Sequence, residues 1–253
     1  KWLFGWGYGS FWLVGSDGPV AMNAPGWIAT MPSGPHGYLD VRYIPPELSV
    51  ADIQDGEFFG EVDARDPVVM RTHGFHWFDK GWMANVSHPS PIRKVAQLYN
   101  LFNTRTEGFA TAFEELMLQA GMFDARPRSR ELIYILLAER AARALGDLGM
   151  QANRFTLEQA SQYASDHTPR GWLSMSGNLV RGEQHLYLQQ PAYGTSYVIG
   201  KLELDKLIAE RRRQLGDRFT MRRFMDEFTA AGLVPMSLLR WELTGAMPDD
   251  VRR

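Results

Sequence analysis

Hydrophobic residues recur every three or four positions along most of the chain from residue 90 onward. This spacing puts them on one face of a helix and predicts amphipathic helices that share a core. The chain is therefore expected to be mainly α-helical. We expect helices over residues 92–102, 106–119, 129–148, 193–215 and 220–231.

Local signals at the helix ends support several of these boundaries. Ser90 followed by Pro91 is typical of an N-cap and a first helical position. Thr156 with Gln159 predicts a capping box at the start of a further short helix. Gly149 is expected to end the helix over 129–148, as a C-terminal glycine commonly does.

The first 67 residues have a different character, with many Gly, Pro and aromatic residues and only short apolar runs. The alternation in residues 38–43 predicts an exposed edge strand. We therefore expect two parts, a small irregular and β-containing part over residues 1–89 and a helical domain over residues 90–253.

Composition narrows the function classes. The 253 residues are 45% hydrophobic, and the formal net charge is −2. Such a chain lacks the basic excess that drives nucleic-acid binding, and it has no apolar run long enough to span a membrane. The absence of cysteine excludes disulfides and thiolate zinc sites, and it leaves a cytoplasmic or a periplasmic location open.

Residues 71–83 carry the first candidate chemistry. His73 and His76 lie one helical turn apart, which presents two imidazoles on one face for a metal ion. The alternative is an aromatic layer in which the imidazoles only form hydrogen bonds. Gly74 follows His73, at the position where a zinc peptidase of the HExxH type carries its general base.

Helical segments farther along the chain supply further candidates. Glu107 opens an apolar helix, and Glu114 lies about two turns later, so an acid on this face needs a cation or a metal if it is buried. Tyr193 and Tyr197 lie one turn apart and either pack or donate to a developing negative charge. His185 is a single candidate just before them. The charged stretches 210–213 and 222–223 are expected to be solvated faces.

Several ordered stretches resemble the DUF885 family of bacterial proteins. EGFATAFEE (residues 107–115) is similar to the family's EGWALYAE, and PAYGTSYVIGKLELDKL (residues 191–207) is similar to PGQALAYKIGQLKILEL. Residues 140–168 and the stretch that begins LGDRF at residue 215 resemble two more family segments. The resemblance implies a zincin-like helical fold, of which this chain would form the C-terminal half.

The resemblance also assigns residues to a metal site. The family motif reads like HEGVPGHHLQ, and His73 matches its first metal histidine. Asp79 stands in place of a second histidine, and Lys80 follows it. Glu107 matches the downstream acidic ligand, and Tyr197 matches the tyrosine of AYKIG.

This assignment leaves the ligand set and the metal open. His73, Asp79 and Glu107 form one set, and His76 is an alternative ligand one turn from His73. Zinc is the first expectation for the divalent metal, with manganese or iron as alternatives.

Three hypotheses for the function follow. The first is a metal-dependent hydrolase or lyase for a small, aromatic or apolar substrate, with Tyr197 stabilising charge and Lys80 or His185 transferring protons. The second is a non-catalytic relative of metallopeptidases that serves as a binding or scaffold subunit. The third is an ordinary metallopeptidase, for which Glu114 is the nearby candidate base. Family members are roughly twice as long, so we also expect a second polypeptide to supply the N-terminal half.

Overall fold

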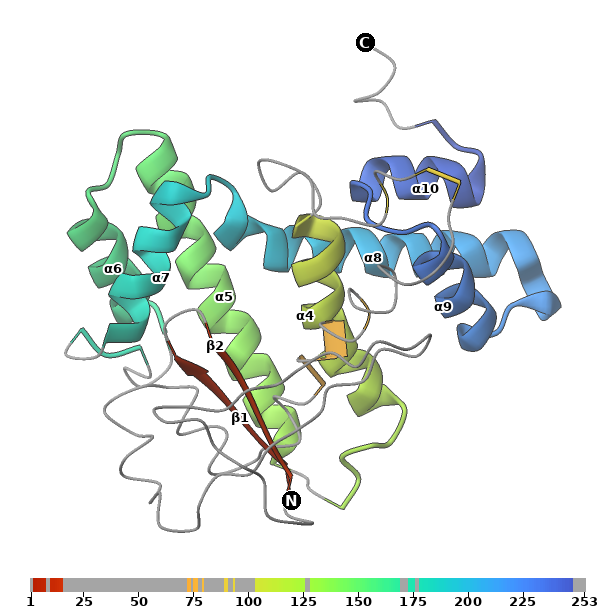
Figure 1. Cartoon of the computed structure of the whole chain (residues 1–253), viewed down its shortest axis with the longest axis horizontal. Coiled ribbons are helices and arrows are strands. Elements are labelled where there is room, and N and C mark those ends of the chain that lie inside the picture. Colours follow the sequence, from red (N-terminus) through yellow and green to blue (C-terminus); the bar gives the residue numbers. More distant parts are fainter. Residues whose placement is uncertain are drawn as a thin grey trace.

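The computed structural model describes residues 2–7, 10–15, 72–73, 75–76, 79, 89–90, 93, 103–125, 128–168, 173–175 and 178–247. These residues form a mainly helical protein (Figure 1), as the hydrophobic periodicity predicts. The predicted edge strand over 38–43 lies outside the described residues, as does most of the predicted helix over 92–102. The division at residue 89 stays a prediction.

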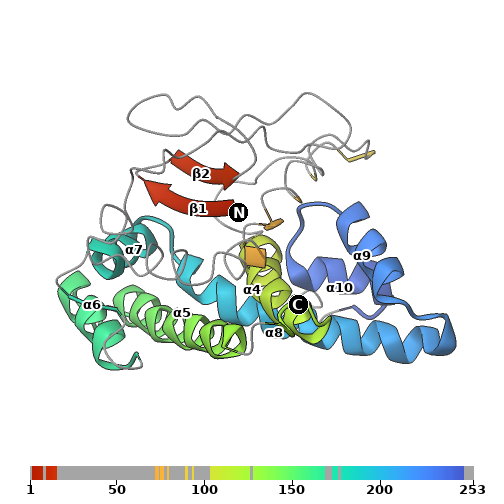
Figure 2. The same ribbon diagram turned by 90° about the horizontal axis from the view of Figure 1, so that it is seen from below.

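The helices follow one another along the chain with short connections. Their bounds are α4 (Asn103–Gln119), α5 (Ser129–Gln151), α6 (Leu157–Asp166), α7 (Asn178–Gln189), α8 (Tyr193–Leu215), the 3-10 helix η4 (Gly216–Arg218), α9 (Met221–Ala230) and α10 (Met236–Thr244). Before them, β1 (Trp2–Gly7) and β2 (Ser10–Gly15) pair antiparallel as a hairpin. Figure 2 shows this hairpin on one side of the layer that contains α4, α5 and α8.

The main apolar core lies where α4, the second half of α8, α9 and α10 meet. Removing this much apolar surface from water is the main force that holds the four helices together. Its buried members are Phe109, Ala112, Leu204, Leu207, Phe224, Phe228, Ala231, Val234, Met236 and Leu239.

Two glycines allow α4 and α8 to cross in backbone contact. A Cβ atom on Gly200 would overlap the carbonyl oxygen of Thr104 and the Cα of Gly108. Because neither glycine carries a side chain, the two backbones approach more closely than ordinary helix pairs, which lie 8–10 Å apart. This crossing brings Glu107, which precedes Gly108 on α4, and Tyr197, which lies one turn before Gly200 on α8, toward the same region.

The start of α8 is held by a carboxylate of another helix. Ala192, at the N-cap position, has no side chain that could accept a hydrogen bond. Instead Asp147 of α5 accepts from the backbone N–H groups of Gly194 at 3.0 Å and Thr195 at 3.4 Å. The negative charge also suits the positive end of the helix, so α5 fixes where the first turn of α8 lies.

The sequence predicted some boundaries correctly and others wrongly; α4, for example, begins at Asn103, three residues before its predicted start. Helix α8 has the predicted bounds, and Thr156 and Gln159 form the predicted capping box at the start of α6. Gly149 was expected to end α5, which was wrong, because α5 continues to Gln151. Gly149 is buried, and a Cβ there would overlap the ring of Phe155, so this glycine makes room for packing instead of ending the helix.

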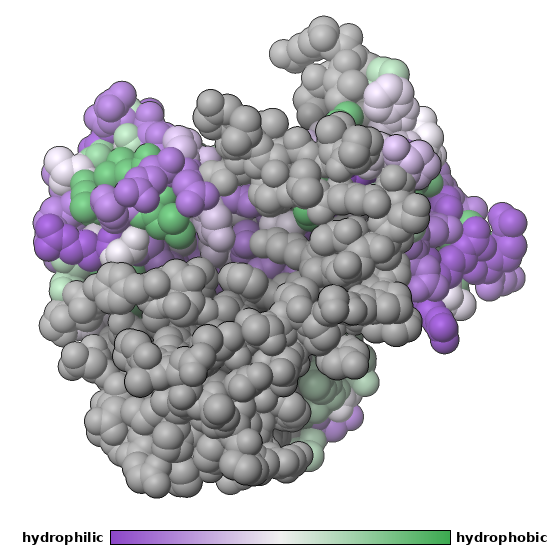
Figure 3. All heavy atoms as spheres, viewed as in Figure 1, coloured by the Kyte–Doolittle hydropathy of each residue, from purple (hydrophilic) through white to green (hydrophobic). Residues whose placement is uncertain are grey.

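In the charged stretches near the end of α8 and on α9, four arginines are exposed, as predicted, namely Arg212, Arg213, Arg222 and Arg223, whereas Glu210 and Arg211 are only partly exposed. Arg211 and Arg223 both pair with Glu227, at 2.8 Å and 3.0 Å. Figure 3 shows hydrophilic side chains gathered at this end of the molecule. Within the described residues, no helix combines the length and the apolar character needed to cross a bilayer.

Candidate metal centre

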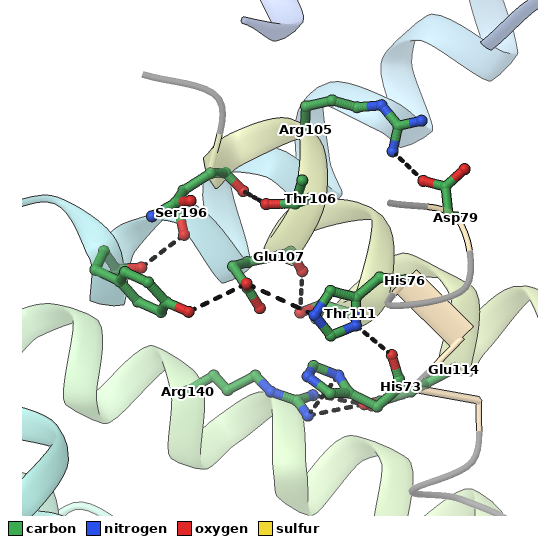
Figure 4. Close-up of polar contacts among 12 residues, drawn as sticks. His73, His76, Asp79, Arg105, Thr106, Glu107, Thr111, Glu114, Arg140 and Ser196 are labelled. Carbon is green, nitrogen blue, oxygen red and sulfur yellow. Dashed lines mark hydrogen bonds and ion pairs between the residues drawn. The ribbon is translucent and has the colours of Figure 1, made fainter. Parts of the chain in front are cut away.

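Two histidines and one acid converge at the place where α4, α8 and the segment around residue 75 meet. His73, His76 and Glu107 each offer one ligand atom, and these atoms all lie within 4.8 Å of one another. His76 and Glu107 are buried, and His73 is partly buried. Figure 4 shows the three side chains turned toward a common point.

The ring of His76 is oriented by the backbone. Its Nδ1 lies 2.6 Å from the carbonyl oxygen of His73. A carbonyl oxygen only accepts, so Nδ1 carries a proton, and in the neutral ring Nε2 carries the lone pair. This Nε2 lies 3.7 Å from Oε1 of Glu107, so the lone pair of the imidazole and the carboxylate oxygen face one point.

The ring of His73 faces a buried ion pair. Its Nδ1 lies 2.8 Å from Oε1 of Glu114 and 3.2 Å from Nη2 of Arg140. Arg140, on α5, donates to both oxygens of Glu114, at 2.9 Å and 2.7 Å. Burial by itself would raise the pKa of Glu114, but the charge of Arg140 and the hydrogen bond from His73 lower it below its usual value. Glu114 therefore remains an ionised acceptor.

Two tyrosines of α8 lie near these ligands, and one of them contacts Glu107. The hydroxyl group of Tyr193 donates to Oε1 of Glu107 at 3.1 Å. Burial, and next the nearby charges, which include Glu107, raise the pKa of Tyr193 and of Tyr197 well above the ordinary value. Both hydroxyl groups are therefore neutral donors. The ring of Tyr197 lies 6.3 Å from the ring of His73, centroid to centroid.

Asp79 lies in a different ion pair. Nη1 of Arg105 donates to Oδ2 of Asp79 at 2.6 Å, and both side chains are buried. The guanidinium of Arg105 in turn lies 3.9 Å from the ring centroid of Phe228. The structure thus brings His73, His76 and Glu107 together and places Asp79 against Arg105, so the geometry favours His76 over Asp79 as the third ligand.

The remaining predicted residues are placed as follows. Lys80 lies outside the described residues. His185 is exposed on α7, and its predicted role in proton transfer stays a prediction. Glu114, the candidate base, has both oxygens bound by Arg140. This geometry favours a structural role for Glu114 over proton abstraction.

The arginines that hold the site had no predicted role. Arg105 and Arg140 are almost fully buried, although arginine is rarely buried unless it is paired. A usable signal was present, because Arg140 follows an apolar helical stripe and falls on its inward side. The partner of each arginine, however, lies 26 residues away in the chain.

The donor set fits a divalent transition metal. Two imidazoles and one carboxylate form the three-ligand set of several catalytic zinc sites, which leave the fourth position open. Ligand atoms about 2.0–2.1 Å from a tetrahedral ion lie about 3.3 Å apart. The 3.7 Å between His76 Nε2 and Glu107 Oε1 is close to that spacing.

Comparisons with known proteins agree with the resemblance. A family model described as "Bacterial protein of unknown function (DUF885)" matches residues 75–243. This match includes His76 and Glu107 and begins two residues after His73. No curated protein matches the chain.

One similar solved structure is that of a "putative lipoprotein" from Colwellia psychrerythraea, with a TM-score of 0.63 and 24% sequence identity. The similarity covers 88% of this chain and 35% of that one. The two proteins therefore share a fold, and this chain spans about a third of the length of the longer structure.

Proposed function

The chain belongs to the DUF885 family, and from that premise we propose that it is a metal-dependent hydrolase or lyase that acts on a small substrate. The supporting observation is the convergence of His73, His76 and Glu107, whose ligand atoms lie within 4.8 Å of one another. We propose that these residues hold one divalent ion, with zinc as the first candidate and manganese or iron as alternatives. The zincin-like relation of the fold is part of this proposal.

A metal bound there would act as a Lewis acid that polarises a carbonyl or phosphoryl oxygen and lowers the pKa of water. The protein supplies the surroundings. Tyr197 keeps its proton because burial raises its pKa, and a neutral hydroxyl can donate to a developing oxyanion. Tyr193 holds Glu107 through a hydrogen bond of 3.1 Å, which fixes the direction of the carboxylate.

Ordinary peptidase chemistry has less support. Gly74 stands where the zinc peptidase motif carries a glutamate base, and Glu114 is bound through both oxygens by Arg140. A base for this proposed reaction would come from Lys80, His185 or the substrate itself. This is why we propose a remodelled reaction in place of ordinary peptide hydrolysis; the small, aromatic or apolar substrate is a separate hypothesis from the aromatic-rich sequence before residue 83.

The rival proposal is a non-catalytic subunit that keeps the metal or only the fold. The same Gly74 favours it, and so does the pairing of Asp79 with Arg105. The two proposals differ in turnover. With a panel of aryl esters, amides and short peptides, His76→Ala and Glu107→Gln abolish turnover of any cleaved compound if the protein is an enzyme. If no compound is cleaved by the metal-loaded protein, the rival is favoured.

Metal content tests the site itself. Protein purified without chelator is expected to hold about one equivalent of a transition metal, measured by inductively coupled plasma mass spectrometry. His76→Ala and Glu107→Gln should lose it, whereas two control variants should keep it: His167→Ala, at an exposed histidine directly after α6, and Glu131→Gln, at an exposed acid on α5. Metal below about a tenth of an equivalent in the unaltered protein, even after incubation with zinc, would overturn the proposal.

A partner polypeptide is a further part of the proposal. Large apolar side chains are exposed on neighbouring helices, namely Leu145 and Leu148 on α5 and Ile199 and Leu202 on α8. Exposed apolar groups of this kind often mark an interface, and the longer solved structure has chain to spare for covering such a face. Native mass spectrometry of the protein from its own host should show a second chain; a bare monomer would contradict this.

A further inference from the structure

Glu114 and Arg140 both contact Nδ1 of the His73 ring, at 2.8 Å and 3.2 Å. We propose that they form a positioning pair that fixes the tautomer of His73, so that its Nε2 is the atom offered to the metal. This inference rests on the proposed metal site and adds a role for two residues beyond it.

The donor and acceptor inventory leads to this assignment. Nδ1 of His73 has two neighbours, Oε1 of Glu114 at 2.8 Å and Nη2 of Arg140 at 3.2 Å. A guanidinium group only donates, and an ionised carboxylate only accepts. If Nδ1 carries the proton it donates to Glu114, and Nε2 is left with the lone pair.

Arg140 determines which hydrogen bond Nδ1 of His73 forms, because it fixes the orientation of the Glu114 carboxylate. Both of its terminal nitrogens donate to Glu114, one to each oxygen, at 2.9 Å and 2.7 Å. Such paired bonds fix the plane and the direction of a carboxylate. With Glu114 so oriented, Oε1 remains a charged acceptor pointed at the His73 ring, and the proton stays on Nδ1.

The two histidines are thus oriented by different means. His76 donates from Nδ1 to a backbone carbonyl oxygen at 2.6 Å, which no side-chain substitution removes. His73 depends on side chains from α4 and α5. This arrangement of a carboxylate behind a ligand histidine is a recognised way to set ligand orientation, and its loss typically costs 10–100-fold in metal affinity.

Energetics also favours a positioning role. Arg140 and Glu114 are almost fully buried, with 2% and 1% of their side chains exposed. A buried ion pair seldom adds net stability compared with apolar residues of similar volume. A pair that contributes little to folding, yet lies against a ligand of the proposed site, is explained by the geometry it imposes.

The test uses imidazole nitrogen spectra of the metal-free full chain, with the His73 signal assigned by its loss in His73→Ala. The unaltered protein should show the proton of His73 on Nδ1. In the double variant Glu114→Leu/Arg140→Met, which leaves no buried unpaired charge, the proton should move to Nε2. Zinc affinity should then fall about 10–100-fold. The signal of His76 should stay unchanged in both proteins.

A conservative variant and a matched control complete the test. In Glu114→Gln/Arg140→Met the amide oxygen still accepts from His73, so the Nδ1 tautomer and most of the zinc affinity should return. Glu115→Leu/Lys201→Met removes another α4 ion pair, of 2.7 Å, and should change neither quantity.

A His73 proton on Nε2 in the unaltered protein, or no change in Glu114→Leu/Arg140→Met, would overturn the inference. If the tautomers behave as expected but zinc does not bind to any of these proteins, the proposed metal function fails, and the control of the tautomer by the pair still stands.

Discussion

The two halves of α8 lie in opposite kinds of surroundings. Its second half packs Leu204 and Leu207 into the apolar core with α9 and α10. Its first half packs on a smaller apolar cluster, but it also places Tyr193 beside Glu107 and Tyr197 beside the buried Arg140. Apolar burial stabilises the first arrangement, whereas the second takes charges out of water at a cost. The buried charges of the polar half are the ones that surround the proposed metal site.

Arg105 joins the two regions. It binds Asp79 on the polar side and lies over the ring of Phe228 on the apolar side. Asp79 is thus held to α4 by an ion pair, and the same guanidinium packs α4 against α9 through a cation–π contact. A substitution should therefore affect one region without affecting the other only if it lies away from Arg105.

The largest expected effect is in the polar region. Arg140→Met leaves Glu114 buried without its cation, so the free energy of unfolding should fall by about 3–5 kcal/mol. The double variant Glu114→Leu/Arg140→Met should recover most of this loss, because apolar replacement of a whole buried pair is often neutral. Urea unfolding of both proteins measures the difference. Equal losses in both would mean that the pair itself supplies stability.

A comparable but slightly smaller effect is expected in the apolar region. Phe224→Ala removes a fully buried ring from α9 and should lower the free energy of unfolding by about 3–4 kcal/mol through lost burial and a cavity. Zinc affinity measured by isothermal titration calorimetry should change by less than about twofold, since distant sites act independently. Phe224→Leu, which fills more of the space, should lose less. A large fall in zinc affinity would show that the two regions are coupled.

The crossing of α4 and α8 should respond to a single methyl group. In Gly200→Ala the new Cβ meets the backbone of Thr104 and Gly108, so the helices must separate and stability should fall by about 3 kcal/mol. Zinc affinity should fall too, because α8 moves away from Glu107. Gly182→Ala on α7 is the control, where a Cβ meets nothing within 4 Å and should stabilise by about 0.5–1 kcal/mol. Unchanged stability in Gly200→Ala would contradict the close crossing.

The smallest expected effect concerns one hydroxyl group. Tyr193→Phe removes the donor to Glu107 and should lower the free energy of unfolding by about 1.5 kcal/mol, as for a bond to a charged group. Zinc affinity should also fall. Tyr134→Phe is the matched control, since that hydroxyl donates at 3.0 Å to the exposed side of Glu115. Thermal unfolding and zinc titration of both variants measure the losses of stability and of zinc affinity. Equal losses in the two variants would show that Tyr193 has no particular role in the metal site.

The sequence predicted helix boundaries well where residues within one turn of the boundary determine it. The bounds of α8 and the capping box of α6 follow from apolar spacing and from residues within one turn. The same approach missed α7 and α10, and it ended α5 too early. At Gly149 the ring of Phe155 decided the outcome, because tertiary packing overrides a local preference of about 1 kcal/mol.

The candidate site likewise has features that the sequence predicted and features that it could not predict. Sequence reasoning named His73, His76 and Glu107, and the structure brings them together. It also named Asp79 and Glu114 without their arginines. Each arginine partner comes from a segment 26 residues away, and no periodicity links such positions. The sequence therefore identified acids that need a cation, but could not show which cation each acid has.

By itself, the sequence determined that the chain is mainly helical, that it resembles one family, and which imidazole and carboxylate groups are available for chemistry. Only the tertiary structure decided which of these groups meet. The physical reason lies in the crossing of α4 and α8 at Gly108 and Gly200. Its closeness sets which side chains reach Glu107, and a ligand set depends on distances of a few ångströms between segments far apart in the chain.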